Sequence, residues 1–99
     1  MKVVWSAWAL DRLDEIHTYL EHDASARTAD KVLARILDAV ALLGQFPQGG
    51  QIEPWLEHKG LGHRRAVVGN YKVVYRIHRR EIRITDVFDA RQDPRKMKG

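Results

Sequence analysis

Residues 63–94 restrict the fold of this chain more than any other segment, because they predict three short strands in succession. β-Branched and aromatic residues fill three runs, at about 63–68, 71–77 and 82–88. Turn residues separate these runs, at Gly69-Asn70 and at Arg79-Arg80-Glu81. Connections this short join antiparallel neighbours, so this third of the chain predicts an antiparallel sheet.

The middle strand indicates which face of the sheet is buried. Alternation places Val73, Tyr75 and Ile77 on one face, which we expect helices to cover. The other face carries Lys72, Val74 and Arg76, and we expect it to be open and to present a row of cations. This phase also directs Tyr71 and Tyr75 into the core.

The last strand has an interrupted alternation. Ile82 and Ile84 share a face, but Asp86 follows them in phase and Val87 does not. A bulge near Thr85-Asp86, or an end to the buried stretch, would explain this pattern.

Residues 6–45 predict two amphipathic helices. The first covers about 6–22, with Ser6 as its cap and apolar residues at helical spacing. The second follows Ser25 and ends before Pro47, since the residue before a proline is pushed out of helical geometry. A short link between two such helices gives an antiparallel hairpin. Residues 2–5 precede them as a short first strand.

Residues 47–62 form the connection between the helices and the three strands. They contain two prolines and four glycines, and a loop of this length is often functional. Because aromatic side chains bury the largest apolar area, we expect Trp55 to anchor this loop on the core.

Size and composition set further limits. With 99 residues the chain makes one domain, residues 1–99. It has no cysteine, which excludes disulfides and thiolate metal sites and fits a reducing compartment. We find no secretory signal at the N-terminus and no apolar run of the ~20 residues that a membrane span needs. We therefore expect a cytoplasmic protein without membrane association.

Charge is distributed unevenly along the chain. Residues 58–99 hold twelve Lys or Arg against four Asp or Glu, a net charge of +8, whereas residues 1–57 have a net charge of −4. A field of this kind favours an anionic partner, either a nucleic acid or an acidic polypeptide.

Several motifs in order resemble the RelE/ParE superfamily of toxins from toxin–antitoxin pairs. They are Val4-Trp5-Ser6, Phe46-Pro47, the run from Arg64 to Tyr71 with Val74-Tyr75-Arg76-Ile77, and Arg91-Gln92-Asp93-Pro94. The resemblance covers nearly the whole chain. It implies a RelE/ParE-like α+β fold in which an antiparallel sheet, in the order β-α-α-β-β-β, packs on a two-helix hairpin. It also implies a toxin of a type II system that a cognate acidic antitoxin, usually encoded beside it, holds inactive.

Two mechanisms occur in this superfamily, and the residues must decide between them. ParE-like members inhibit DNA gyrase, and RelE-like members cleave mRNA in the ribosome without a metal. Such cleavage needs an acid, a base and cations for the phosphate. The candidates here are Lys72, Arg76, Asp89 and Arg91. Nuclease members often end the last strand with His or Tyr, whereas Asp89, with an ordinary pKa near 4, is a weak base.

We therefore expect a ParE-like toxin rather than an enzyme, with a ribosome-dependent endoribonuclease as the alternative and a binding module as a third reading. The partners would be the antitoxin and either gyrase or ribosome-bound mRNA, and a homodimer is a further expectation. The residues expected to bind the antitoxin or target are Arg64, Arg65, Lys72, Arg76, Arg91, Arg95 and Lys96.

The five histidines predict no metal site and no cofactor. No pair has the spacing of a metal-binding helix, and no cysteine accompanies them. His63 and His78 lie at strand ends beside the basic residues. They are spare acid–base candidates, but we expect them to be solvated.

Overall fold

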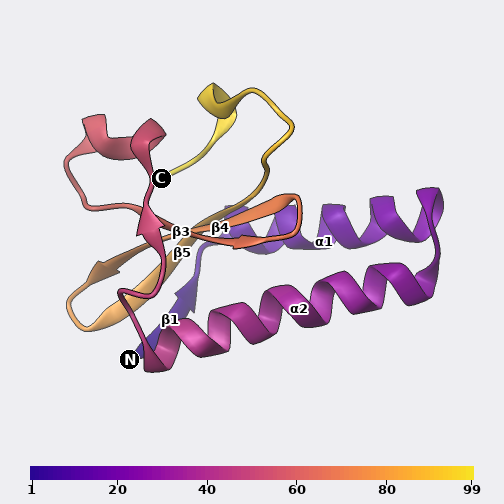
Figure 1. Ribbon diagram of the computed structural model, residues 1–99, viewed down its shortest axis with the longest axis horizontal. Helices are drawn as coiled ribbons and strands as arrows, with labels where there is room; N and C mark the ends of the chain where they lie inside the picture. Colours follow the sequence, from indigo (N-terminus) through magenta and orange to yellow (C-terminus); the bar gives the residue numbers. More distant parts are fainter.

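The computed structural model describes all 99 residues as an α+β fold (Figure 1). A five-stranded sheet has the order β1-β5-β4-β3-β2. The elements are β1 (Lys2–Trp5), α1 (Ala7–Asp23), α2 (Ala26–Gln45), β2 (Gln51–Ile52), η1 (Pro54–Lys59), β3 (Arg64–Val68), β4 (Tyr71–His78), β5 (Glu81–Asp89) and η2 (Pro94–Lys96), where η1 and η2 are 3₁₀ helices.

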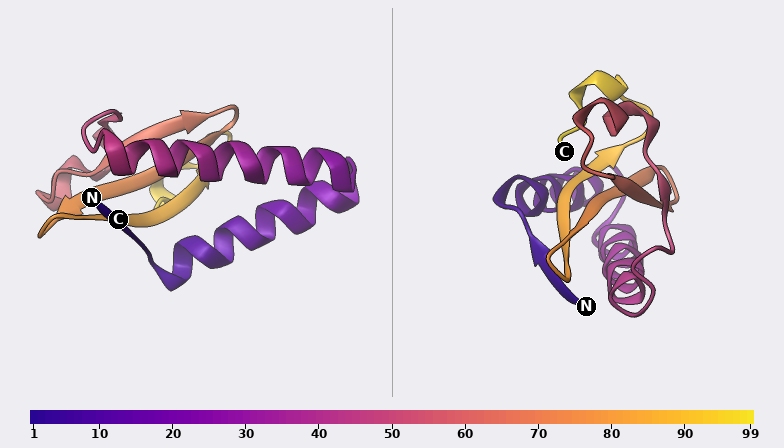
Figure 2. Two further views of the ribbon diagram at one scale, coloured as in Figure 1. Left: turned by 90° about the horizontal axis from the view of Figure 1, so that it is seen from below. Right: turned by 90° about the vertical axis from the view of Figure 1, so that its left-hand side faces the viewer.

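The two long helices begin at the predicted serine caps. The Ser6 hydroxyl accepts a hydrogen bond from the amide of Ala9, and Ser25 accepts one from Thr28, each at 3.0 Å. α2 ends at Gln45, two residues before Pro47. Figures 1 and 2 show α1 and α2 side by side as a hairpin on one face of the sheet. The predicted helical hairpin is therefore confirmed.

The sheet is mixed rather than purely antiparallel. β3, β4 and β5 form an antiparallel meander, as predicted, but β1 runs parallel to β5, with Val3 opposite Ile82. Parallel strands need a long crossover, and the helical hairpin between β1 and the meander supplies it. Neither helix has the length and apolar character required to cross a membrane.

The predicted phase of β4 is confirmed. Val73 and Tyr75 have no exposed surface and pack in the main core beneath the helices, with Tyr71 beside them. In β5, Ile84 pairs with Tyr75 while Asp86 pairs with Val74. Thr85 is therefore an extra residue, and the expected bulge returns Val87 to the helix-covered face.

The outer face of the sheet, the face away from the helices, is not open as predicted. Leu56 from η1 and Met97 pack there against Val74 and Phe88 in a second apolar cluster. Figures 1 and 2 show η1 and the C-terminal segment on this side of the sheet. The structure thus has a third layer, built from the loop that was expected to be irregular.

Leu56, not Trp55, anchors that loop. Leu56 is 2% exposed and Trp55 is 52% exposed, so the prediction for Trp55 is wrong. Pro54 starts a 3₁₀ helix, in which neighbouring side chains point about 120° apart. Only one of the two residues can face the sheet, and that residue is Leu56.

Candidate functional site

Two of the expected binding cations are neutralised by a buried carboxylate. Glu53 has no exposed surface, and its carboxylate lies 3.0 Å from Nζ of Lys72 and 3.7 Å from an Nη atom of Arg65. The same carboxylate accepts a hydrogen bond from the amide of Trp55 as the cap of η1. Lys72 and Arg65 therefore hold the loop on the sheet, and their charge is largely compensated.

The role of Glu53 was missed from the sequence. The available signal was its place immediately before Pro54, which is typical of a residue that caps a short helix.

Arg64 also anchors the loop. It lies opposite Tyr75 in the β3–β4 register and donates a hydrogen bond of 2.7 Å to the carbonyl of Gly50. The Tyr75 hydroxyl donates to the carbonyl of Pro47 at 2.8 Å and accepts from the amide of Gly50 at 3.0 Å. Arg64 is therefore not part of an open basic surface.

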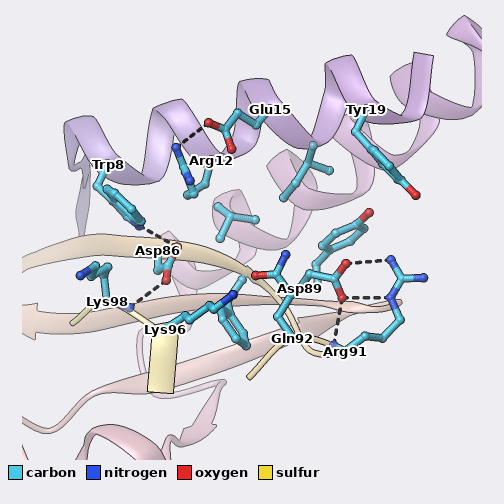
Figure 3. Close-up of a pocket in the computed structure, with 14 residues that line it drawn as sticks. Trp8, Arg12, Glu15, Tyr19, Asp86, Asp89, Arg91, Gln92, Lys96 and Lys98 are labelled. Atoms are coloured by element: carbon cyan, nitrogen blue, oxygen red, sulfur yellow. Dashed lines mark hydrogen bonds and ion pairs between the residues drawn. The ribbon is translucent and has the colours of Figure 1, made fainter. Parts of the chain in front are cut away.

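A cavity of about 720 Å³ lies where β5 extends beyond β1 and faces α1 (Figure 3). We call it the α1–β5 groove. α1 contributes an aromatic side chain at each end and an ion pair of 2.6 Å between Arg12 and Glu15. Its polar and aromatic lining consists of Trp8, Arg12, Glu15, Tyr19, Tyr71, Asp86, Phe88, Asp89, Arg91, Gln92, Lys96 and Lys98.

Asp86 lines the α1–β5 groove at the end near Trp8 and is 2% exposed. It accepts hydrogen bonds from the indole of Trp8 at 3.1 Å and from the amide of Lys98 at 2.8 Å (Figure 3). Burial raises the pKa of this carboxyl, and these two donors oppose the rise. Asp86 thus ties the segment after η2 to both β5 and α1.

Asp89 and Arg91 form a closed pair at the other end of the groove (Figure 3). The guanidinium donates to the two carboxylate oxygens at 3.0 and 2.7 Å, and the backbone amide of Arg91 adds a bond of 2.9 Å. The bonds from Arg91 hold the pKa of Asp89 below its ordinary value. Asp89 is therefore a poorer base than an ordinary carboxylate, and the charge of Arg91 is compensated.

The structure does not bring the four nuclease candidates together. Lys72 and Arg76 lie on the outer face, in phase with the buried Val74. Asp89 pairs with Tyr71, which belongs to the core on the opposite side of the sheet. Asp89 and Arg91 therefore point into the α1–β5 groove, away from Lys72 and Arg76.

The remaining cations of the predicted binding set differ in how far they are paired. Arg95 is bound to Asp93 by a pair of 2.7 Å. Lys96 lines the α1–β5 groove and takes part in no ion pair, and Arg76 is likewise without a carboxylate partner.

His63 is buried, so the prediction that it is solvated is wrong. It is 2% exposed, and neither ring nitrogen has a hydrogen-bond partner. Burial and the nearby charge of Arg76 lower its pKa, and the pKa of His78 is lowered by the same two causes. No group of three or more His, Asp or Glu side chains could hold a metal ion.

A second groove lies between α2 and β3, with a volume of about 550 Å³. We call it the α2–β3 groove. Leu42, Phe46 and Val67 line it and are each more than half exposed. Because β2 pairs only with Arg64 and Arg65, residues 66–68 of β3 have no strand on this side. The groove thus combines an apolar surface with an unpaired strand edge.

The comparisons with known proteins agree with this fold. No curated protein sequence matches the chain at a significant level. A solved structure described as "Chromosomal ParDE TA system from P. aeruginosa" is similar, with a TM-score of 0.74 and 22% sequence identity, over 90% of this chain and 95% of that one. The sequence model of a family described as "ParE toxin of type II toxin-antitoxin system, parDE" matches residues 3–94. The chain therefore belongs to the ParE family of toxins of type II toxin–antitoxin systems.

Proposed function

We propose that this toxin inhibits bacterial growth by acting on DNA gyrase in the cytoplasm, and that an acidic antitoxin neutralises it. Membership of the ParE family supports this branch of the superfamily. The structural observation that carries the proposal is the separation of Lys72 and Arg76 from Asp89 and Arg91 by the sheet.

This separation argues against a metal-independent ribonuclease. General acid–base cleavage needs the acid, the base and the phosphate-binding cations within hydrogen-bond reach of one scissile phosphate. Lys72 forms an ion pair with Glu53, and Asp89 forms one with Arg91. Neither pair offers a free base beside a free cation.

The α2–β3 groove supports the expectation of an antitoxin partner. An amphipathic or extended segment could cover Leu42 and Phe46 while its backbone pairs with the open edge of β3. Acidic residues of the same partner would be attracted by the net charge of +8 in residues 58–99. A second copy of this chain is the alternative occupant, and size-exclusion chromatography of the toxin alone distinguishes the two.

Two assays on the purified toxin test the target. We expect the protein to inhibit supercoiling by gyrase and to leave mRNA on translating ribosomes intact. Cleavage of that mRNA, if lost on Arg91→Ala, would establish the nuclease alternative instead. If cleavage were also lost on Asp89→Asn, the carboxylate would be the base.

A growth assay tests toxicity and the antitoxin together. Expression of the chain alone should arrest bacterial growth, and co-expression of a short acidic protein encoded beside it should restore growth. Normal growth at confirmed expression of the folded protein would contradict the proposed toxicity.

A further inference from the structure

His63 is a buried polar side chain that nothing in the chain satisfies. A neutral imidazole has one N–H donor and one acceptor nitrogen, and both are left without a partner here. Burying such groups unpaired is unfavourable, and native structures usually place a ligand, an ion or water against them.

The surroundings of His63 are basic. Extending the β3–β4 register by one residue places His63 opposite Arg76, since Arg64 lies opposite Tyr75. The charges of Arg76 and Lys59 act on the imidazole, and His63 forms no ion pair with an Asp or Glu side chain. Arg76 has no ion pair, whereas Arg83, its cross-strand neighbour in β5, is bound to Glu81.

We propose that His63, Arg76 and Lys59 form a binding site for a phosphate group. The three side chains come from three places: His63 immediately before β3, Arg76 in the second half of β4 and Lys59 at the end of η1. An imidazolium, a guanidinium and an ammonium together supply donors from several directions, which suits a tetrahedral anion better than a planar carboxylate. Protonation of His63 on binding would satisfy both of its nitrogens and add a third positive charge.

Residues 97–99 cover this site. Gly99 packs closely on the imidazole. A Cβ atom at this position would lie 2.8 Å from Nε2 of His63 and 3.1 Å from Cδ of Lys59. Met97 is buried beside Leu56, and the Lys98 carbonyl accepts a hydrogen bond of 3.1 Å from the hydroxyl of Thr85. A phosphate group must displace this segment, so weaker anchoring of the segment should strengthen phosphate binding.

The site does not depend on the cellular target proposed above, because its test uses inorganic phosphate and the isolated toxin. Nuclear magnetic resonance follows the imidazole protons of the histidines through a pH titration with and without phosphate, and the spectrum of His63→Leu assigns the His63 signal. We expect phosphate to raise the pKa of His63 and to leave the position of the His22 imidazole signals unchanged.

Three variants test how much individual side chains contribute to phosphate binding. Arg76→Gln should weaken phosphate binding by about tenfold or more, because it removes a charge-assisted hydrogen bond. Arg80→Gln, which removes the same charge from an exposed turn, is the matched control and should change affinity less than about twofold. Thr85→Val keeps the β-branched shape but removes the bond to Lys98, and it should increase the affinity for phosphate.

Comparison of inorganic phosphate with a short DNA duplex distinguishes a free phosphate ion from a backbone phosphate, because only a probe that reaches this site raises the pKa of His63. An unchanged pKa of His63 with both probes would overturn the proposal. An equal loss of phosphate affinity in Arg76→Gln and Arg80→Gln would also overturn the proposal, because phosphate binding would then follow net charge alone.

Discussion

At the scale of single residues, the cations of this protein differ mainly in whether a carboxylate compensates them. Lys72 and Arg65 share the buried Glu53, and Arg91 is bound by Asp89. The sequence places Lys72 and Arg65 on strands correctly, but it does not show these pairings. Glu53 and Lys72 are far apart in the chain and meet only because η1 folds over the sheet.

Glu53→Gln should lower the free energy of unfolding by about 2 kcal/mol, because it leaves Lys72 and Arg65 without their counter-charge. This value is below that of a fully buried pair, since the two cations are partly exposed. Urea denaturation measures the change, and Glu57→Gln on the exposed side of η1 is the control. Equal stability of the two variants would show that the Glu53 pairs contribute nothing.

His63 should make stability depend on pH. Its pKa in the folded protein is below the ordinary value of 6.5, mainly through burial. Between these two values the unfolded chain binds more protons than the folded one, so the free energy of unfolding rises as pH rises toward 6.5. His63→Leu should reduce this slope in urea titrations at several pH values. His78, whose pKa is lowered as well, contributes a slope of the same sign, whereas His17, whose pKa the hydrogen bond with Asp30 raises, contributes one of opposite sign. An unaltered slope would mean that the burial of His63 has no energetic consequence.

At the scale of elements, local signals were sufficient for the helices and for the meander. Ser6 and Ser25 cap as expected, and of the two explanations for the interrupted alternation of β5, the bulge near Thr85 is the one that the structure has. The short strand β2 and the 3₁₀ helix η1 were missed, because their two and six residues are too short to show a hydrophobic period. Long-range packing on the outer face decides their structure.

Gly50 shows how closely this loop is packed. A Cβ atom there would lie 2.5 Å from the carbonyl oxygen of Arg65 and 2.7 Å from the Tyr75 hydroxyl. Gly50→Ala should therefore displace β2 and lower the free energy of unfolding by about 2–3 kcal/mol.

Gly44→Ala is the matched control for Gly50→Ala. Gly44 lies within α2, where its nearest neighbour would be 3.4 Å from the new methyl group. Because alanine favours a helix over glycine, this variant should be neutral or more stable by up to about 1 kcal/mol. Urea denaturation compares the two, and a loss of stability for Gly44→Ala equal to that for Gly50→Ala would contradict the steric argument.

At the scale of the whole molecule, the sequence predicted the helical hairpin, the sheet beneath it and the asymmetry of charge. It did not predict the third layer, which η1 and the C-terminal segment form on the outer face. The expected row of exposed cations is divided by pairing and by η1 into compensated and free charges. Arg76 and Lys96 are two of the free ones, on the outer face and in the α1–β5 groove. Attraction for an acidic partner should therefore depend on a few positions rather than on the total charge.

Replacing Arg76 and Lys96 together with Glu should weaken binding to the antitoxin, which we propose to be acidic, by about tenfold to a hundredfold, through lost attraction and new repulsion. Arg27→Glu with Lys31→Glu changes the net charge equally on an exposed part of α2, and this control should have a much smaller effect. Calorimetry measures both affinities, with circular dichroism to confirm folding. Raising the salt concentration should also slow association of the unmodified toxin, because the free cations are screened. Equal affinities for the two double variants would show that the charge asymmetry acts through the whole molecule and that the antitoxin contacts neither free cation.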